Sequence, residues 1–295
     1  MSKRVLITGS EGFTGKYVSA EFTQAGWEVW RSGLQPKPES SYYLQLDLRA
    51  PESLAAINSL IQPDVVVHLA AASFVAERDH ALFYNVNVAG TGHLLETLSQ
   101  SEKPPNCTIL ASSANIYGNS VAEVLKENSP LDPANHYAVS KVAMELIAKT
   151  YMNRLGIIIT RPFNYTGVGQ DAKFLVPKLV EHFKLGMREI ELGNTDVYRD
   201  FSDVRDIAKY YLWLAENQPT GETFNLCSGQ SMSIEQIIRN LETLTGHRVK
   251  VLSNPNYVRE NEIKRLRGSN TKLLEMARDF APINFQHTLS WMLSR

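Results

Sequence analysis

The chain has 295 residues, of which 43% are hydrophobic and 21% are charged, and its formal net charge is -1 at pH 7. This length allows a large buried core, and the near-neutral charge argues against nucleic acid or an anionic membrane as the main partner. We expect a cytoplasmic protein, because the first residues lead directly into a strand and no segment approaches the roughly 20 apolar residues that span a bilayer. Cys107 and Cys227 lie far apart, which favours neither a disulfide framework nor a zinc site.

The first predicted elements are a strand, a glycine-rich turn and a helix. An apolar strand at residues 5–8 leads into Gly9, Gly12 and Gly15, which are spaced three apart, and Val18 and Phe22 then recur on one helix face. Such a turn allows the free N–H groups and positive end of the helix to hold a pyrophosphate. The start of the chain therefore predicts dinucleotide binding, with an ordinary glycine-rich turn as the alternative.

Strand-like runs continue along the chain at regular intervals. They lie at residues 28–30, 43–45, 65–69, 108–111 and 157–161, and helical stretches follow the first five strands except the second. Helices are also expected at 176–183 and 204–215, a strand at 223–226, and a further helix from a capping box that begins at Ser233. This alternation predicts an α/β fold with a doubly wound parallel sheet covered on both faces.

The end of the second strand is where a dinucleotide enzyme contacts the adenosine ribose. A carboxylate there suits the two ribose hydroxyls of NAD, whereas a cation suits the 2′-phosphate of NADP. The chain has Arg31 and Ser32 after Trp30 and no acid at this point. We therefore favour NADP(H), bound by Arg31 and Ser32, with NAD(H) as a possible cofactor and a solvated surface arginine as the alternative.

A serine-containing strand end and a tyrosine–lysine pair are the candidate catalytic features. Residues 109–118 form a buried-looking strand that runs into Ser112 and Ser113, and Tyr137 and Lys141 stand four residues apart, on one helix face. A free phenol has a pKa of about 10, and a nearby ammonium favours the phenolate. The set can polarise a carbonyl and move a proton, although the pair alone could be an exposed surface feature.

Together these segments resemble the extended short-chain dehydrogenase/reductase family, whose members act on nucleotide sugars. The resemblance covers nearly the whole chain and includes residues 8–15, 47–48, 68–71, 87–91, 137–141 and 161–164. It implies a Rossmann domain at 1–163 plus 203–230, interleaved with a substrate domain at 164–202 plus 231–295. It also implies a homodimer that forms through helices near 84–99 and 136–151.

The resemblance assigns roles residue by residue. The implied catalytic residues are Ser113, Tyr137 and Lys141. The implied cofactor-binding residues are Gly9, Gly12, Phe13, Thr14, Gly15, Arg31, Ser32, Asp47, Leu48, Leu69, Ala70, Ala71, Asn87, Ser112, Tyr137, Lys141 and Pro162. The implied substrate-binding residues are Ser73, Ser113, Asn164, Val176, Arg199 and Arg259, the two arginines being matched to the pyrophosphate of a nucleotide sugar. Ser269 stands where the family often has an aspartate, which weakens the placement of Arg259.

The residues after Ser113 bear on the type of reaction. Family members that are 4,6-dehydratases carry acidic residues at the positions of Ala114 and Asn115, so a dehydratase is disfavoured. A 4-epimerase needs the same triad with a tightly held NAD, which Arg31 argues against. Segments 161–164, 199–204, 224–230 and 267–269 resemble GDP-6-deoxy-4-keto-mannose reductases and related 4-ketoreductases, which implies reduction of the C4 ketone of a nucleotide-linked 4-keto-6-deoxyhexose in deoxysugar precursor biosynthesis. GDP is favoured and dTDP possible. A non-catalytic NADP-sensing or scaffold protein is the alternative of another class.

Other charged clusters have simpler interpretations. Asp200, Asp203 and Asp206 recur every third residue at a helix start, where acids complement the helix dipole. The basic run near residues 259–272 is interrupted by acids and lacks aromatic residues for base stacking. We therefore expect no metal site and no nucleic-acid partner.

Overall fold

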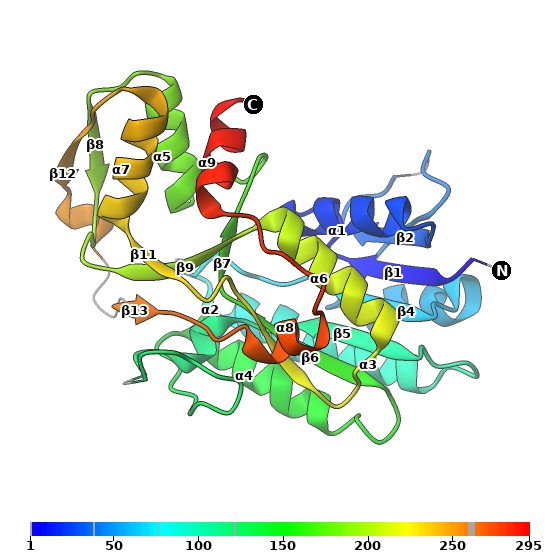
Figure 1. Cartoon of the computed structure of the whole chain (residues 1–295). Helices are drawn as coiled ribbons and strands as arrows, with labels where there is room; N and C mark the ends of the chain where they lie inside the picture. Colours follow the sequence, from blue (N-terminus) through cyan, green and yellow to red (C-terminus); the bar gives the residue numbers. More distant parts are fainter. Residues whose placement is uncertain (1, 38, 76, 121, 259–262) are drawn as a thin grey trace.

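The computed structural model describes residues 2–37, 39–75, 77–120, 122–258 and 263–295. Its centre is a seven-stranded, wholly parallel sheet in the order β10-β6-β5-β4-β1-β2-β3 (Figure 1). The strands are β1 Arg4–Thr8, β2 Glu28–Gly33, β3 Tyr43–Gln45, β4 Val65–His68, β5 Cys107–Ala111, β6 Ile157–Pro162 and β10 Thr223–Leu226. The order reverses between β1 and β4, as in a doubly wound sheet.

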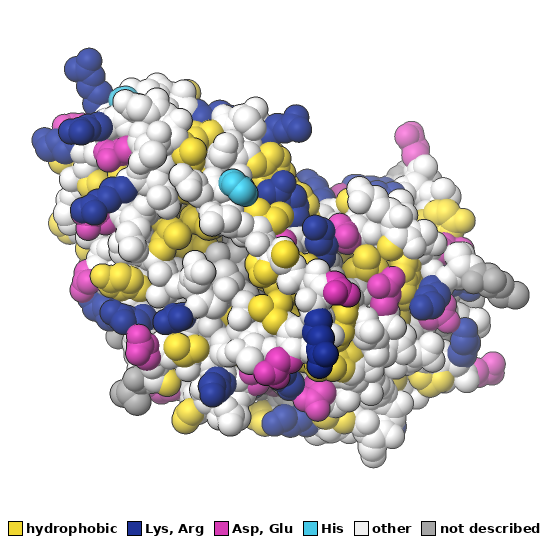
Figure 2. All heavy atoms as spheres, viewed as in Figure 1, with side chains coloured by type: hydrophobic (Ala, Val, Ile, Leu, Met, Phe, Trp, Pro, Cys, Tyr) yellow, Lys and Arg dark blue, Asp and Glu magenta, His cyan; other side chains and the backbone are white. Residues whose placement is uncertain are grey.

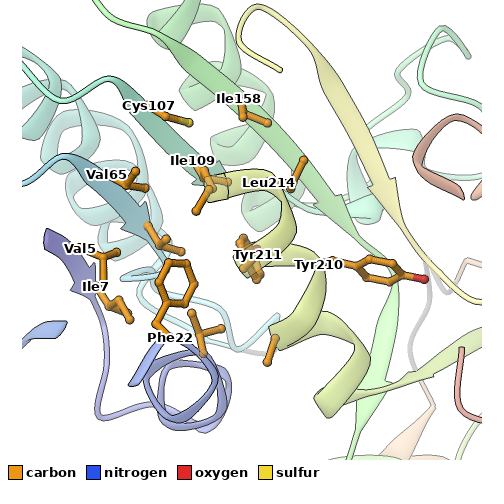
Figure 3. Packing of buried hydrophobic residues seen from close by; sticks show 14 of the residues in the cluster. Val5, Ile7, Phe22, Val65, Cys107, Ile109, Ile158, Tyr210, Tyr211 and Leu214 are labelled. Carbon is orange, nitrogen blue, oxygen red and sulfur yellow. The ribbon is translucent and has the colours of Figure 1, made fainter. Parts of the chain in front are cut away.

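Helices cover both faces of this sheet. Helices α1 (Phe13–Gln24) and α6 (Val204–Asn217) pack on one face, and α3 (Thr91–Ser99) and α4 (His136–Lys149) pack on the other (Figure 1). Because successive side chains of a strand point to opposite faces, each strand must be apolar on both sides. Figure 3 shows the result on one face, where strand residues point toward Phe22 of α1 and Tyr211 and Leu214 of α6.

A second group of elements lies at one end of the sheet (Figure 1). One small sheet has four strands: β7 Asn164–Thr166, β9 Tyr198–Asp203, β11 Ser231–Ser233 and β13 Arg265–Leu266. A second sheet has two strands, β8 Glu189–Leu192 and β12 Lys250–Ser253. Around them pack α5 Leu175–Lys184, α7 Ile234–Thr245 and α9 Phe285–Leu293, whose apolar residues form a separate core. Helix α8 (Thr271–Met276) packs beside β10. The predicted capping box of α7 is confirmed, since Ser233 and Gln236 exchange both hydrogen bonds.

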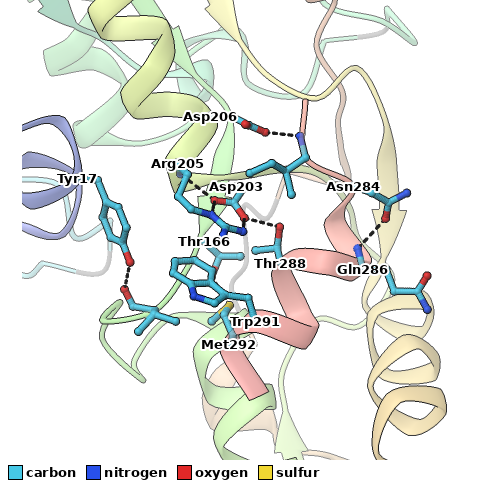
Figure 4. A network of polar contacts seen from close by, with 12 residues as sticks. Tyr17, Thr166, Asp203, Arg205, Asp206, Asn284, Gln286, Thr288, Trp291 and Met292 are labelled. Atoms are coloured by element: carbon cyan, nitrogen blue, oxygen red, sulfur yellow. Dashed lines mark hydrogen bonds and ion pairs between the residues drawn. The ribbon is translucent and has the colours of Figure 1, made fainter. Parts of the chain in front are cut away.

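Polar contacts connect the last helix, α9, to the start of α6 (Figure 4). Asp203 caps α6, receives two hydrogen bonds from the Arg205 guanidinium, and accepts a third bond from the Thr288 hydroxyl of α9 at 2.7 Å. The guanidinium also lies 3.9 Å from the Trp291 ring centroid. These contacts fix the C-terminal segment against the sheet domain.

The predicted fold class is confirmed, and one local expectation, the end of the second strand, is wrong. The helix expected after β3 is present as an irregular helical stretch, made of the 3₁₀ segment Pro51–Leu54 and the π-helical segment Ile57–Ile61, which ends at Gln62 with φ 47°. Strand β2 continues past Trp30 to Gly33, because Arg31 and Ser32 pair with β3. Short helical segments also occur at His80–Phe83 (α2), Ala114–Tyr117 and Pro255–Tyr257, and the π-helical segment Tyr84–Gly90 joins α2 to α3.

The surface seen in Figure 2 carries Lys and Arg side chains interspersed with Asp and Glu. Within the described ranges, every helix is too short or too polar to cross a membrane. The division into residues 1–163 plus 203–230 and 164–202 plus 231–295 stays a prediction, although β10 does pair with β6 in the main sheet.

Candidate active site

A cleft of about 1790 Å³ opens at the carboxyl ends of the sheet strands and extends to α5 and β9. This is the edge where open α/β sheets bind ligands. The cleft brings together most of the residues that the sequence singled out. Those on its wall are Gly9, Gly12, Phe13, Thr14, Gly15, Ser32, Asp47, Leu48, Leu69, Ala70, Ala71, Ser73, Ser112, Ser113, Tyr137, Lys141, Pro162, Asn164, Val176 and Arg199.

The glycine turn forms a cradle that leaves no room for a Cβ at Gly9 or Gly15. Gly9 has φ +68°, and an added Cβ there would lie 2.8 Å from the backbone of Ala70. A Cβ at Gly15 would lie 2.3 Å from the Gly9 carbonyl oxygen, whereas one at Gly12 would meet only that oxygen, at 3.3 Å. Helix α1 begins at Phe13 without a side-chain cap, so its first N–H groups are available to an anion. The cradle fits the pyrophosphate of a nicotinamide dinucleotide.

Buried polar residues form hydrogen bonds with the loop after β4 and position it. Asn87 was expected to touch the cofactor, but it is fully buried. Its side-chain amide accepts a hydrogen bond from the Ala72 N–H and donates one to the Ala72 carbonyl. It also donates to the Ser140 hydroxyl at 3.0 Å. The direct contact predicted for Asn87 is therefore wrong, because its polar atoms are used to position the loop. His68, buried between Thr8 and Thr91, has its pKa lowered to about 3 by burial, so it is neutral.

At the adenosine end of the cleft, Arg31 and Ser32 face opposite sides of β2. Arg31 is exposed and donates to the Ser40 hydroxyl at 3.2 Å. Ser32, the next residue of the strand, points inward, and its hydroxyl donates to the Ile7 carbonyl at 3.4 Å. The Ser32 side chain thus faces the opposite side of the strand from Arg31, because alternate residues of a strand face opposite sides. The Asp47 carboxylate accepts two bonds from the Arg49 guanidinium, which lowers the pKa of Asp47.

The catalytic candidates meet where β5 ends and α4 begins. Ser113 follows β5 and caps a short turn by accepting a hydrogen bond from the Asn115 N–H at 3.2 Å. Tyr137 lies in the first turn of α4, which Asn135 caps, and Lys141 follows one turn later. The Lys141 ammonium donates to the Ala111 carbonyl at 2.7 Å. The buried hydroxyl of Ser112 has no partner among the described residues, as expected of an atom that a bound group would satisfy.

Burial sets the proton affinities of this group. It raises the pKa of Tyr137 to about 12, an effect that a hydrogen bond with the Ser113 side chain partly offsets. Burial also lowers the pKa of Lys141 to about 8, although the Glu145 carboxylate opposes this. The sequence-based expectation of an acidified Tyr137 phenol is therefore wrong for this structure, because burial outweighs any lowering of its pKa by Lys141, whose ammonium donates to a carbonyl. At neutral pH the phenol is protonated and the lysine is charged.

A buried ion pair connects helix α4 to strand β6. Arg161 of β6 donates to both carboxylate oxygens of Glu145, at 3.0 and 2.7 Å, and their side chains are 8% and 4% exposed. The same guanidinium donates to the Tyr117 hydroxyl at 2.9 Å. From the sequence, Arg161 and Tyr117 are recognisable only as parts of motifs. Their connection to Glu145 depends on strand and helix placement that a sequence does not give.

On the substrate side, Asn164 begins β7, Val176 lies in α5 and Arg199 lies in β9, all on the cleft wall. Ser73 lies on the loop after β4. Arg259, the second arginine predicted to bind the substrate, lies outside the described residues.

Several residues that line the cleft were missed from the sequence. Tyr165 forms a hydrogen bond with the Thr14 hydroxyl at 2.7 Å, and its ring stacks with Phe13. Lys178 of α5 donates to the Glu191 carbonyl and lies 4.8 Å from the Tyr257 ring centroid. The only available signal was the position of Tyr165 directly after Asn164. Among the described residues, no group of three or more His, Cys, Asp or Glu side chains could hold a metal ion.

Comparisons with known proteins agree with this arrangement. A family model described as GDP-mannose 4,6 dehydratase matches residues 6–276. The chain is 34% identical to the GDP-6-deoxy-D-talose 4-dehydrogenase of Aggregatibacter actinomycetemcomitans, over 92% of this chain and 90% of that protein. It is 32% identical to the GDP-6-deoxy-D-mannose reductase of Pseudomonas aeruginosa, over 100% of this chain and 97% of that protein.

Solved structures show the same fold. RMD from Pseudomonas aeruginosa, complexed with NADPH, has a TM-score of 0.85 and 30% identity, covering 99% of this chain and 98% of that one. The UDP-glucose 4-epimerase of Thermus thermophilus, in complex with NAD, has a TM-score of 0.87 and 25% identity over the same shares, 99% and 98%. The family match and the two relatives show that the chain belongs to the GDP-mannose 4,6 dehydratase family of extended short-chain dehydrogenase/reductases, and that it is an NAD(P)-dependent oxidoreductase.

Proposed function

We propose that this enzyme reduces the C4 ketone of a nucleotide-linked 4-keto-6-deoxyhexose, with NADPH as the favoured cofactor. The observation that carries the proposal is the position of Ser113, Tyr137 and Lys141 in one cleft, between the glycine cradle and the Asn164 and Arg199 side. A bound reduced nicotinamide supplies the hydride. Two relatives, at 34% and 32% identity, are named for oxidation or reduction of GDP-deoxyhexoses.

The side chains have complementary tasks in such a reduction. The Ser113 hydroxyl, next to the Tyr137 phenol, polarises the ketone oxygen. Tyr137 gives its proton to the oxygen as negative charge develops there, and its raised pKa ensures that it holds that proton at neutral pH. The Lys141 ammonium, charged below a pKa of about 8, then stabilises the phenolate that remains.

The substrate half of the cleft suits a nucleotide sugar. The Arg199 guanidinium, on the cleft wall, can pair with a pyrophosphate, and the Asn164 amide can bond a sugar hydroxyl. Lys178 and Tyr257 line the same region and provide a cation and an aromatic ring. We favour a GDP-linked sugar over a dTDP-linked one, because both relatives are named for GDP sugars.

The residues beside Ser113 oppose the dehydratase alternative. Ala114 and Asn115 provide no carboxylic acid there, and Ala114 is buried, whereas elimination of water needs an additional acid and base. A 4-epimerase with a retained NAD would use the same triad, and the epimerase from Thermus thermophilus has the same fold. The two activities differ in stoichiometry, since only a reductase consumes NADPH.

Replacing Tyr137 with Phe tests the assigned chemistry. Tyr137→Phe should lower kcat for reduction by about 10²- to 10⁴-fold, because the proton donor is lost, while dinucleotide binding remains measurable by titration. Tyr151→Phe, the same change just beyond the end of α4, is the matched control and should leave kcat unchanged. Equal activity of the Tyr137→Phe and wild-type enzymes would refute the assignment.

We also propose a homodimer formed through the helical surface of α3 and α4. On α4, the apolar side chains of Val139 and Leu146 lie seven residues apart and are 38% and 57% exposed. Two helical turns separate them, so they share one face. A second copy of the chain would cover this face.

A further inference from the structure

An ion pair lies at the adenosine end of the cleft. The Lys37 ammonium contacts the Glu11 carboxylate, and both residues line the cleft. Glu11 belongs to the glycine turn, and its Cγ would be 3.1 Å from a Cβ placed on Gly33. The Glu11 carboxylate therefore lies against the end of β2, where a dinucleotide enzyme contacts the adenosine ribose.

Lys37 also borders a second hollow next to the cleft. This hollow, of about 620 Å³, is lined by Arg31, Lys37, Glu39, Ser40 and Ser41. It combines two cations with two hydroxyl side chains, and Glu39 is its only carboxylate among the described residues that line it. Cations and hydroxyls of this kind are ordinary ligands of a phosphate group.

Lys37 is held between the two regions by weak contacts. Its ammonium lies 5.5 Å from the Tyr43 ring centroid, in addition to the pairing with Glu11. The side chains of Lys37 and Glu11 are 44% and 39% exposed. An ion pair this accessible to water contributes little to stability, so the ammonium can exchange partners at small cost. The other ion pair at this end, Arg49 with Asp47, is bidentate.

We propose that the Glu11–Lys37 ion pair determines which dinucleotide the enzyme accepts. With a 2′-phosphate present, Lys37 leaves Glu11 and becomes the second cation beside Arg31. Without that phosphate, the Glu11 carboxylate accepts hydrogen bonds from the two ribose hydroxyls. This inference rests on the proposed cofactor use and extends it: the chain binds both dinucleotides, and Lys37 provides part of the preference for NADPH.

The test is a binding measurement on the intact protein without sugar substrate. NADPH and NADH are titrated by calorimetry into the wild type, Lys37→Gln, Glu11→Gln and the control Lys184→Gln, which removes a charge from the exposed end of α5. Lys37→Gln should weaken the binding of NADPH about tenfold, equivalent to ~1.4 kcal/mol, and should change the binding of NADH little. Glu11→Gln should strengthen the binding of NADPH, because it frees the Lys37 ammonium. It should weaken the binding of NADH, because it removes the carboxylate that accepts hydrogen bonds from the ribose.

The outcomes separate this inference from the proposed reaction. If Lys37→Gln shifts the ratio of the two dissociation constants no more than Lys184→Gln does, or if Glu11→Gln leaves the ratio unchanged, the pair does not select the cofactor. Those results would leave the ketoreductase proposal intact. Conversely, the predicted shifts in binding would stand even if no 4-keto sugar were reduced.

Discussion

Tyr137 illustrates how one residue can be chosen correctly from sequence and still be misjudged in its chemistry. Spacing placed it beside Lys141 and suggested an acidified phenol. Instead, burial of the side chain raises the pKa of Tyr137 to about 12. A phenol that keeps its proton is suited to donate it during ketone reduction, so the correction supports a proton donor better than the original expectation did.

The three glycines of the turn also have distinct roles at this scale. An added Cβ at Gly15 would lie within 2.5 Å of two backbone atoms of residues 9 and 10, whereas Gly12 has one contact, at 3.3 Å. Gly15→Ala should therefore reduce the free energy of unfolding by about 3 kcal/mol through overpacking. Gly12→Ala should keep its stability within about 1 kcal/mol, but weaken dinucleotide binding because its methyl group occupies the cradle.

Urea unfolding and dinucleotide titration of both glycine variants check this prediction. Gly26→Ala is not a suitable control, because Gly26 has φ +79°. Wild-type protein is the reference instead. Equal loss of stability in the two variants would show that the glycines act only in folding.

At the scale of elements, β9 and the start of α6 contain three aspartates that sequence could not tell apart. All three were expected to complement the helix dipole. Asp203 does cap the helix, but Asp200 accepts hydrogen bonds from Ser228, Gly229 and Gly268. Asp206 is buried, with one oxygen bonded to the Ile283 N–H and the other without a partner among the described residues. Their roles depend on segments that are distant in the sequence.

Asp206 gives the structure a predicted pH dependence. Burial raises its pKa to about 6, above the ordinary value of 3.8, so the folded state binds a proton that the unfolded state releases between these values. The stabilisation that this proton provides is present below pH 4 and is lost as the pH rises through 6. Asp206→Asn should consequently raise the free energy of unfolding at pH 8 by up to about 3 kcal/mol.

Thermal unfolding at pH 8 and pH 4 measures this effect. The gain of Asp206→Asn should disappear at pH 4, where the wild-type carboxyl is already neutral. Asp196→Asn, at a side chain that is 84% exposed, should show no such pH dependence. A stabilisation that is equal at both pH values would contradict the role of the buried charge.

For the whole molecule, sequence predicted the architecture well because the central strands are continuous apolar runs. Strands β4, β5, β6 and β10 begin and end within one residue of their predicted bounds. The extension of β2 was missed because serine and glycine are poor strand formers. The buried role of Asn87 and the pairing of Glu11 with Lys37, 26 residues apart, were missed because residue type does not reveal the direction of a side chain.

We propose that one cleft binds NADPH and a nucleotide-linked 4-keto-6-deoxyhexose for reduction at C4. The most direct test of this claim follows NADPH oxidation with GDP-, dTDP- and UDP-linked 4-keto-6-deoxyhexoses and identifies the sugar product. We predict that one NADPH is oxidised for each 4-hydroxy sugar formed, with the GDP-linked ketone preferred. Failure to oxidise NADPH with any of these donors, or interconversion of 4-epimers without net NADPH consumption, would contradict the claim.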